Sequence, residues 1–291
     1  MNTASANSEK TRLSRRDVLR SAPAFVAASL LAQQAPAALL PLQTTELEHL
    51  GMTVPDPKAA ADFYGRIFDP QLFQEREPPL RYYVRLGSAY IAFGSATDPR
   101  SGADPNLPTR IDHFCVLVNN YQPRELRTAL EQAGINMGQG RFGLPTDADG
   151  IRLQVAGTPG GLTRTVIPGP RLSADDAAVE AIGLDHIVLA VSDLDRSSAY
   201  YTKLFGPPAS RSKKPERIWF QIARQRLALE PVAAGAKPAI QRLCVKIAGF
   251  NRHSIPEKLK KLGIEILPKE EEHLVSFRDL NGFLIDLAAE T

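Results

Sequence analysis

The sequence predicts an α+β protein built from four copies of one strand–helix–strands unit. The first observation is an ungapped internal repeat, in which residues 47–70 (LEHLGMTVPDPKAAADFYGRIFDP) align with residues 184–207 (LDHIVLAVSDLDRSSAYYTKLFGP). The second is a pair of weaker copies, in which residues 111–118 (IDHFCVLV) and 240–247 (IQRLCVKI) each precede a helical segment. Repetition of this kind indicates one supersecondary unit used several times.

Within each copy, the pattern changes from strand to helix and back to strands. In the first copy, alternating residues predict a strand that carries His49 on one face with Leu47, Gly51 and Thr53. Asp56 is suited to cap the helix that follows, whose apolar residues recur at helical spacing. These apolar residues are Phe63, Tyr64, Ile67 and Phe68. The other helices are expected over 123–135, 196–204 and 255–264.

The spacing supports the equivalence of the two weaker copies. Gly134 follows His113 by 21 residues, and Gly263 follows Arg242 by the same number. Each glycine stands where the residue after a helix end is expected. Tight-turn pairs then introduce the last strand of both copies: Asp149-Gly150 and Asn281-Gly282.

The chain therefore divides into four βαβββ modules and two short flanking parts. The modules cover about 45–95, 109–157, 182–232 and 239–289. Residues 158–181 are rich in proline and glycine and are predicted to be a linker. We expect one two-module domain over 45–157 and a second over 182–291.

Residues 1–37 have the pattern of a twin-arginine export signal. Arg15 and Arg16 precede an apolar stretch over 22–32, and Ala35-Pro36-Ala37 offers a small-residue cleavage site. The apolar stretch is shorter than the roughly 20 residues that a membrane span needs. We expect export to the periplasm or the exterior, and no membrane span in the mature form.

The charge balance argues against a nucleic-acid partner. The chain holds 35 basic and 32 acidic residues, and five of the former and two of the latter lie within residues 1–37. The remainder carries 30 of each and lacks the basic footprint that nucleic-acid binding needs. Cys115 and Cys244 occupy equivalent positions in the second and fourth modules. We therefore expect two buried free thiols on different strands, not a disulfide.

These motifs resemble those of the vicinal oxygen chelate superfamily, which includes glyoxalase I, bleomycin-resistance proteins and extradiol ring-cleaving dioxygenases. The resemblance rests on the first strand with its histidine, the aromatic helix motif and the terminal Asp-x-Asp/Asn-Gly hairpin, and it covers nearly all of residues 45–290. It implies that paired modules form two half-barrel cups. Each cup would bind a divalent metal (Fe, Mn, Ni or Zn) through its first and last strands, and a small molecule would chelate that metal.

Carried onto this sequence, the resemblance names four first-strand positions and four last-strand positions. The first-strand positions are His49, His113, His186 and Arg242. The last-strand positions are Phe93, Gln154, Glu230 and Asp286. Aromatic residues on the predicted strands are candidates for stacking on a ligand or for the core: Tyr82, Tyr83, Tyr90, Phe93, Trp219 and Phe220.

The order of module pairing decides which of these residues meet. In-order pairing places His49, His113 and Gln154 in one cup, a set of two imidazoles and one amide oxygen. The other cup then holds His186, Glu230, Arg242 and Asp286, where arginine cannot be a metal ligand. Crosswise pairing instead joins His113, Gln154, His186 and Glu230 into a four-ligand set. The short connection over 232–239 favours the in-order arrangement.

Three functions are consistent with these patterns. The in-order set favours a metal-dependent ring-cleaving dioxygenase acting on an aromatic molecule. The crosswise set favours a glyoxalase-type isomerase or lyase. A metal-free protein that sequesters a small molecule is the third. The catalytic residues and the oligomeric state are not fixed by the sequence.

Overall fold

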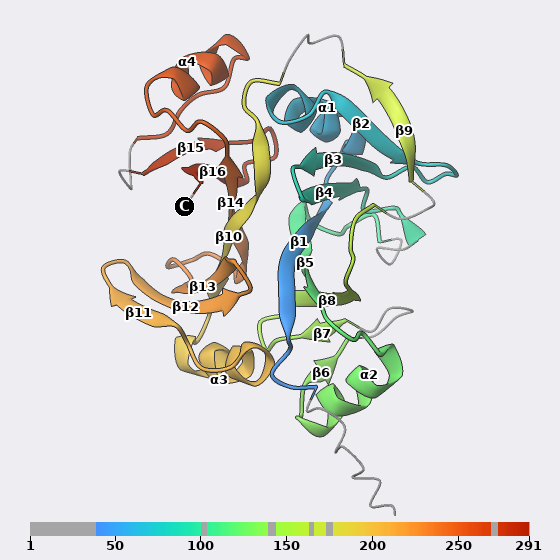
Figure 1. Cartoon of the computed structure of the whole chain (residues 1–291), viewed down its shortest axis with the longest axis vertical. Coiled ribbons are helices and arrows are strands. Elements are labelled where there is room, and N and C mark those ends of the chain that lie inside the picture. The colour runs from blue at the N-terminus through green and yellow to red at the C-terminus, as the bar shows by residue number, and fades with distance from the viewer. Residues whose placement is uncertain are drawn as a thin grey trace, which may run out of the picture. The chain divides into compact units, whose positions relative to one another are not determined.

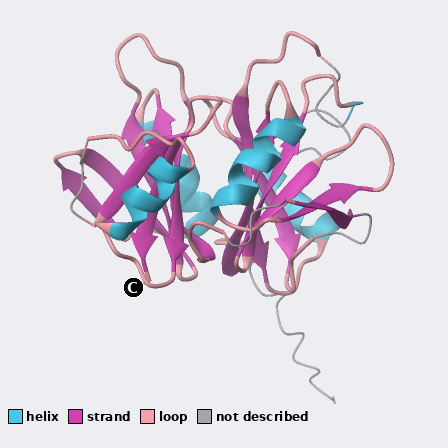
Figure 2. Cartoon of the chain, turned by 90° about the horizontal axis from the view of Figure 1, so that it is seen from above, coloured by secondary structure: helices cyan, strands magenta, loops and turns pink. Residues whose placement is uncertain are grey.

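The structure, a computed structural model, describes residues 39–99, 104–138, 144–162, 166–172, 177–268 and 273–290. The predicted export signal lies outside these residues. Residues 39–291 form one compact unit, and their strands gather into two groups (Figure 2).

The first sheet combines modules one and two. Its nine strands lie in the order β6-β7-β8-β5-β1-β4-β3-β2-β9 (Figure 1). Their bounds are β1 Thr44–Thr53, β2 Gln71–Glu75, β3 Tyr82–Leu86, β4 Ala89–Gly94, β5 Arg110–Val118, β6 Asn136–Met137, β7 Pro145–Thr146, β8 Arg152–Gly157 and β9 Val166–Arg171.

The second sheet combines modules three and four. Its seven strands lie in the order β11-β12-β13-β10-β14-β16-β15. Their bounds are β10 Ala181–Val191, β11 Ser210–Lys213, β12 Glu216–Ile222, β13 Gln225–Pro231, β14 Ala239–Ile247, β15 Leu274–Arg278 and β16 Leu284–Ala289.

The modules pair in order. The first strands of modules one and two, β1 and β5, run antiparallel at the centre of the first sheet. The first strands of modules three and four, β10 and β14, do the same in the second sheet. The crosswise alternative is therefore wrong: His113 and Gln154 lie on the first sheet, whereas His186 and Glu230 lie on the second.

The four helices begin and end close to the predicted positions. They are α1 Pro57–Ile67, α2 Pro123–Gln132, α3 Leu194–Phe205 and α4 Ser254–Lys261. Asp56 caps α1, since its carboxylate accepts the backbone N–H of Ala59 at 2.9 Å. Gly134 and Gly263 adopt φ values of 71° and 76°, the left-handed conformation expected just after a helix. None of the described helices is long and apolar enough to cross a membrane.

Two equivalent tyrosine–aspartate contacts connect the two halves of the chain. Tyr64 on α1 of module one donates its hydroxyl hydrogen bond to Asp279 of module four, at 3.0 Å. Tyr201 on α3 of module three donates to Asp147 of module two at the same distance. Helices α1 and α3 thus each contact the terminal hairpin of the opposite half. One apolar cluster includes Leu50 of the first sheet and Ile187 of the second, so the halves share a core.

The segment predicted as a linker contributes a strand to the first sheet. Within residues 158–181, β9 pairs antiparallel with β2 at the sheet edge. Leu162 and Val166 pack against a small cluster formed by Phe73, Tyr83 and Tyr90. This segment therefore forms part of the wall on the cup side of the first sheet.

Candidate metal centre

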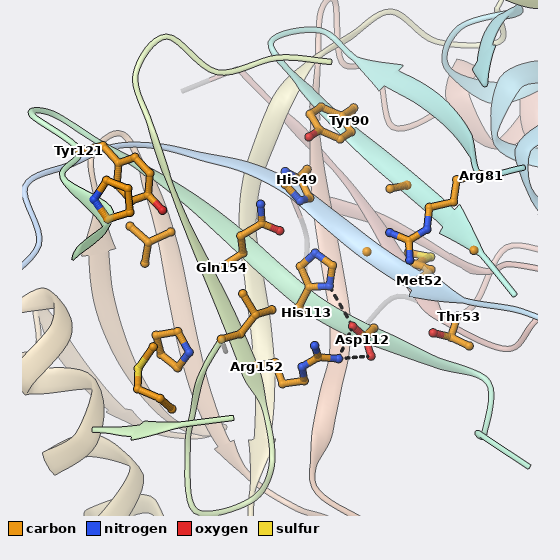
Figure 3. Close-up of a pocket in the computed structure, with 18 of the residues that line it drawn as sticks. His49, Met52, Thr53, Arg81, Tyr90, Asp112, His113, Tyr121, Arg152 and Gln154 are labelled. Carbon is orange, nitrogen blue, oxygen red and sulfur yellow. Dashed lines mark hydrogen bonds and ion pairs between the residues drawn. The ribbon is translucent and has the colours of Figure 1, made fainter. Parts of the chain in front are cut away.

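The first sheet carries a cavity of about 740 Å³, and the face of the sheet that lines it is called the first cup below. The lining includes three of the predicted ligand positions, His49, His113 and Gln154 (Figure 3). Tyr83 and Tyr90 add aromatic surface, as the strand pattern allowed. In-order pairing therefore places His49, His113 and Gln154 in one cavity, as expected.

His49 enters the first cup beside an acidic neighbour. Opposite β5, the register of β1 passes from Leu47 to His49, so Glu48 is the extra residue of a β-bulge. The bulge places Glu48 and His49 on the same side, and the His49 Nδ1 lies 2.9 Å from Glu48 Oε2. The His49 ring also stacks on Tyr90, with 4.6 Å between the ring centroids. Because an ionised carboxylate only accepts, this contact favours the tautomer with the proton on Nδ1, in which Nε2 is the nitrogen that can bind a cation.

His113 has the same arrangement on the neighbouring strand. Asp112 is the extra residue of a bulge in β5, and its Oδ2 lies 3.0 Å from His113 Nδ1. Burial alone raises the pKa of Asp112, but the hydrogen bond from His113 and the charges of His113, Arg152 and Arg110 outweigh it and lower the pKa overall. Desolvation lowers the pKa of His113 below its ordinary value. Its imidazole is therefore neutral at pH 7, the state that binds metals.

Gly51 makes room for the His113 ring. The two residues are paired across β1 and β5, and a Cβ built on Gly51 would lie 2.6 Å from His113 Nδ1. No other residue type fits beneath the ring without moving it. The ring centroids of His49 and His113 are 5.5 Å apart.

Gln154 reaches the first cup from β8. It is paired with Cys115 on β5, and paired residues share one face of a sheet. Among the described residues, its side-chain amide has no hydrogen-bond partner, although it is partly buried and lines the cavity. Two imidazoles and one uncommitted amide oxygen form a donor set that suits a divalent cation and leaves coordination positions open. The residues present therefore fit a metal, with less negative charge than a carboxylate in place of Gln154 would supply.

Phe93 is not a cup residue, which corrects the alignment of module one. It is fully buried and packs against Tyr64 on α1, with 5.2 Å between the ring centroids. The strand pairing shows the true equivalence, because His49 is opposite Tyr90 and His186 is opposite Arg226. Four residues further along each strand, the counterpart of Glu230 is Gly94.

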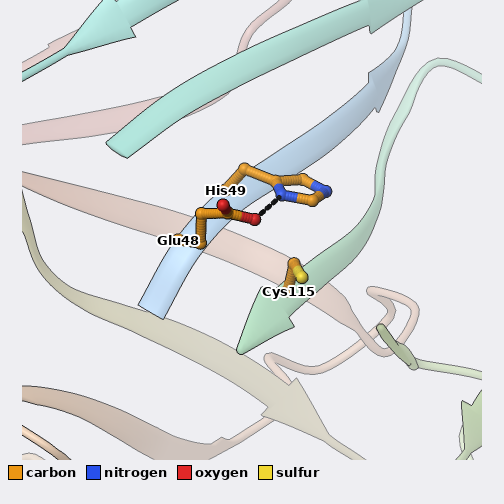
Figure 4. A group of neighbouring side chains, drawn as sticks. All are labelled: Glu48, His49 and Cys115. Atoms are coloured by element: carbon orange, nitrogen blue, oxygen red, sulfur yellow. Dashed lines mark hydrogen bonds and ion pairs between the residues drawn. The ribbon is translucent and has the colours of Figure 1, made fainter. Parts of the chain in front are cut away.

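A second grouping of ligand-type side chains lies behind His49. Glu48, His49 and Cys115 are all buried, and their ligand atoms lie within 4.8 Å of one another (Figure 4). Glu48 is already engaged, since one oxygen faces His49 Nδ1 and the other accepts the backbone N–H of Gly161. Desolvation, followed by the charge of Glu48, raises the pKa of Cys115 well above its ordinary value, so the thiol stays protonated and is a poor ligand. This group supports His49 from behind. Both cysteines are buried and free, as predicted.

The second cup, on the equivalent face of the second sheet, is filled by side chains that pair with one another. Arg242 donates to Asp286 at 3.1 Å, and both residues are buried. Glu230 accepts hydrogen bonds from Arg217 and Gln241. The interpretation of this cup as degenerate is consistent with these ion pairs, which neutralise its charges internally.

His186 repeats the histidine–carboxylate contact in the second cup. Asp185 is again the bulged residue, and its Oδ2 lies 2.6 Å from His186 Nδ1. Arg226 also donates to Asp185, and its guanidinium lies 4.6 Å from the centre of the Trp219 ring. The guanidinium of Arg226 thus lies against both Asp185 and Trp219, the two side chains that contact His186.

The remaining carboxylates near the first cup are also engaged. Tyr83 donates to Glu75 at 2.7 Å, and Arg152 donates to both oxygens of Asp112. Arg81 Nε donates to Asp98 at 2.6 Å. The wall therefore presents guanidinium groups and aromatic rings, and its acidic groups are held by partners.

The acidic partners of the histidines were missed by the sequence analysis. A signal was present, because an acidic residue precedes the histidine at three equivalent positions: Glu48, Asp112 and Asp185. Regular alternation would place neighbouring residues on opposite faces, so the pattern gave no reason to join them. The bulges that bring them together leave no mark in the hydrophobic pattern.

Known proteins resemble this chain in two ways. Solved structures share the fold of most of the chain, and a family model matches the sequence of its second half. Residues 183–287, which span modules three and four, match the family described as Glyoxalase/Bleomycin resistance protein/Dioxygenase superfamily. No curated protein gives a match.

Solved structures of similar fold cover most of the chain. One is a Mn(II)-bound glyoxalase from Novosphingobium aromaticivorans, with 17% identity, a TM-score of 0.60 and coverage of 86% of this chain and 83% of that one. Another is a catechol 2,3-dioxygenase, with 14% identity, a TM-score of 0.60 and coverage of 86% and 89%. A third is the 2,3-dioxygenase LapB from Pseudomonas sp. KL28, with 14% identity, a TM-score of 0.58 and coverage of 86% and 93%. At these identities the similarity establishes the fold alone. The predicted α+β, glyoxalase/extradiol dioxygenase-like fold is confirmed.

Proposed function

We propose that the first cup binds a divalent metal through His49, His113 and Gln154, and that the protein is a metal-dependent, extradiol-type ring-cleaving dioxygenase. The observation that carries this proposal is the orientation of the two imidazoles. Both have Nδ1 held by a bulged carboxylate, which leaves both Nε2 atoms as acceptors beside the uncommitted amide of Gln154. Two imidazoles and one carboxylate suit a redox-active iron site with open positions, and here Gln154 takes the place of the carboxylate.

The substrate class follows from the wall of the cavity. The tyrosine that stacks on His49 provides a flat surface for an aromatic ring. Arg152 also lines the cavity; its Nη1 is paired with Asp112, and its other N–H groups can donate to ring oxygens. A small aromatic molecule with two neighbouring oxygen atoms combines both properties. When bound, the metal would polarise those oxygens and provide the redox centre.

A glyoxalase-type reaction is the less favoured alternative. Proton transfer at a metal-bound carbon acid needs a carboxylate free to act as a base. In the described part of the first cup, Glu48 and Asp112 both hold histidines, and Glu75 accepts from Tyr83. Ring cleavage makes a smaller demand on free carboxylates, so the geometry favours it.

The proposed location is outside the cytoplasm. The twin-arginine pattern over Arg15 and Arg16 supports export by a route that carries folded proteins, which would allow a metal to be loaded before export. Export by the chain's own signal should therefore be kept in any test of metal content.

The first test is elemental analysis of the mature, exported protein beside three variants. We expect about one equivalent of metal in the wild type, none in His113→Ala, and an unchanged content in His186→Ala of the second cup. Gln154→Glu should tighten metal binding, because it restores a negative ligand. Oxygen uptake with catechol as the probe then tests ring cleavage. Absence of metal from the folded wild type would overturn the proposal and leave a metal-free binding protein.

A further inference from the structure

All four first strands contain a bulge at an equivalent position. The extra residue is Glu48 in module one, Asp112 in module two, Asp185 in module three and Gln241 in module four. The three acidic residues each precede a histidine, whereas the glutamine precedes Arg242 and donates to Glu230. The bulge is thus common to all four modules, and its residue is acidic only where a histidine follows.

Glu48 differs from the other two carboxylates in its partners. Asp112 accepts from Arg110 and Arg152 as well as facing His113. Asp185 accepts from Arg226 and lies 3.5 Å from Lys246 Nζ. In the part of the chain that the structure describes, Glu48 has no lysine or arginine partner.

The contacts of Glu48 come from the imidazole of His49, the thiol of Cys115 and the backbone. Its second oxygen accepts the N–H of Gly161, which belongs to the segment between the two halves. Gly160 has no room for a side chain, because a Cβ there would overlap the Glu48 carboxylate. Glu48 is only 3% exposed, so water screens its charge weakly. In the described part of the chain, the Glu48 carboxylate thus faces His49 with no competing cationic side chain.

We propose that Glu48 is a positioning residue that supplies, one hydrogen bond behind His49, the negative charge that Gln154 does not bring to the metal. It fixes the tautomer in which His49 Nε2 can bind a cation, and its charge makes that nitrogen a stronger donor. Gly161 holds the carboxylate in place. This inference rests on the proposed metal site in the first cup.

The test compares metal affinity in Glu48→Gln with that in a matched variant of the second cup. Metal-free protein is titrated with Mn(II) and, separately, with Zn(II) against a competing chelator. We expect Glu48→Gln to weaken binding by about 10- to 100-fold, and Asp185→Asn to leave it unchanged. Adding Gln154→Glu to Glu48→Gln should recover most of the lost affinity, because it moves the charge from behind the ligand to the ligand position. Glu48→Asp, which keeps the charge but shortens the side chain, should give an intermediate loss and serves if Glu48→Gln does not fold.

A second readout follows the tautomer without any metal. Nitrogen chemical shifts of the imidazoles in metal-free protein should show His49 protonated at Nδ1 in the wild type, and a mixture of tautomers in Glu48→Gln. An unchanged tautomer together with an unchanged affinity would overturn the inference and leave the metal site standing. A wild type that binds no metal would overturn the site, while the tautomer shift would still establish the orienting role of Glu48.

Discussion

Replacing Tyr201 with phenylalanine removes one hydroxyl group from the contact between the two halves of the chain. Tyr201 is 1% exposed, and its hydroxyl donates to Asp147 Oδ2 at 3.0 Å. The other carboxylate oxygen accepts the backbone N–H groups of Asp149 and Ile151, which holds the hairpin turn. The substitution therefore leaves the turn intact and removes the only side-chain donor that this aspartate has among the described residues.

The expected loss in the free energy of unfolding is about 2 kcal/mol. A hydrogen bond to a charged group contributes about 1.5–3 kcal/mol, and Phe fills the space of the ring without a cavity. Burial already raises the pKa of Asp147, so the folded protein can protonate this carboxylate and reduce the cost. For a unit of this size, the loss corresponds to a fall in Tm of about 4–8 °C. Urea unfolding and thermal melts measure both quantities.

The neighbouring tyrosine provides a matched control. The Tyr200 hydroxyl is buried and has no hydrogen-bond partner among the described residues. Tyr200→Phe should therefore change the free energy of unfolding by less than about 0.5 kcal/mol or raise it, because an unsatisfied buried group is removed. Equal effects of Tyr200→Phe and Tyr201→Phe would refute the reasoning. Tyr64→Phe, at the equivalent contact with Asp279, should reproduce the loss seen for Tyr201→Phe.

Three further predictions concern the two cups and the hairpin. Gly51→Ala should weaken Mn(II) binding by about 10- to 100-fold in a protein that still folds, because the new Cβ displaces His113. Asp286→Ala should cost about 3–5 kcal/mol in urea unfolding, because it leaves Arg242 buried without its carboxylate, and it should not alter the metal content. Burial raises the pKa of Asp147, so the folded chain binds this proton more tightly than the unfolded chain does. The free energy of unfolding should therefore fall as the pH rises from about 4 through the raised pKa, and Asp147→Asn should remove that part of the slope in unfolding curves recorded between pH 4 and 7.

The repeat made the fold predictable. Aligning His49 with His186 fixed the phase of two modules, and the glycines after the helices fixed the phase of the other two. Hydrophobic pattern and turn chemistry are local properties, so the sequence carries them directly. Module pairing is not a local property. Its prediction rested on the short connection over 232–239, which favoured in-order over crosswise pairing.

The sequence predicted which strands carry the site residues, and it did not predict which side chains those residues contact. His49, His113 and Gln154 line one cavity, as in-order pairing predicted, and their binding of a metal stays a prediction. Regular alternation put Leu47 on the face of His49 and Glu48 on the opposite face. The bulge at Glu48 reverses both placements, because it shifts the alternation by one residue. Leu47 consequently lies in the core, away from His49. The hairpin aspartates were assigned to turns alone, since nothing in the sequence pairs Asp147 with a tyrosine more than fifty positions away.

The two cups carry different charges at equivalent positions of their sheets. In the second cup, Arg242 and Asp286 stand where the first cup has His113 and Gln154, and they neutralise each other across 3.1 Å. A metal is disfavoured in the second cup, because it would have to displace the buried Arg242 guanidinium from Asp286. In the first cup the same two positions hold His113 and Gln154, and a carboxylate lies behind each imidazole. Asp112 is shared with Arg110 and Arg152, whereas Glu48 has no lysine or arginine partner among the described residues. Glu48 is therefore the carboxylate that would favour a cation in this cup. The half that matches the superfamily by sequence is thus the half whose cup is closed by internal ion pairs, and the proposed metal donors lie in the other half.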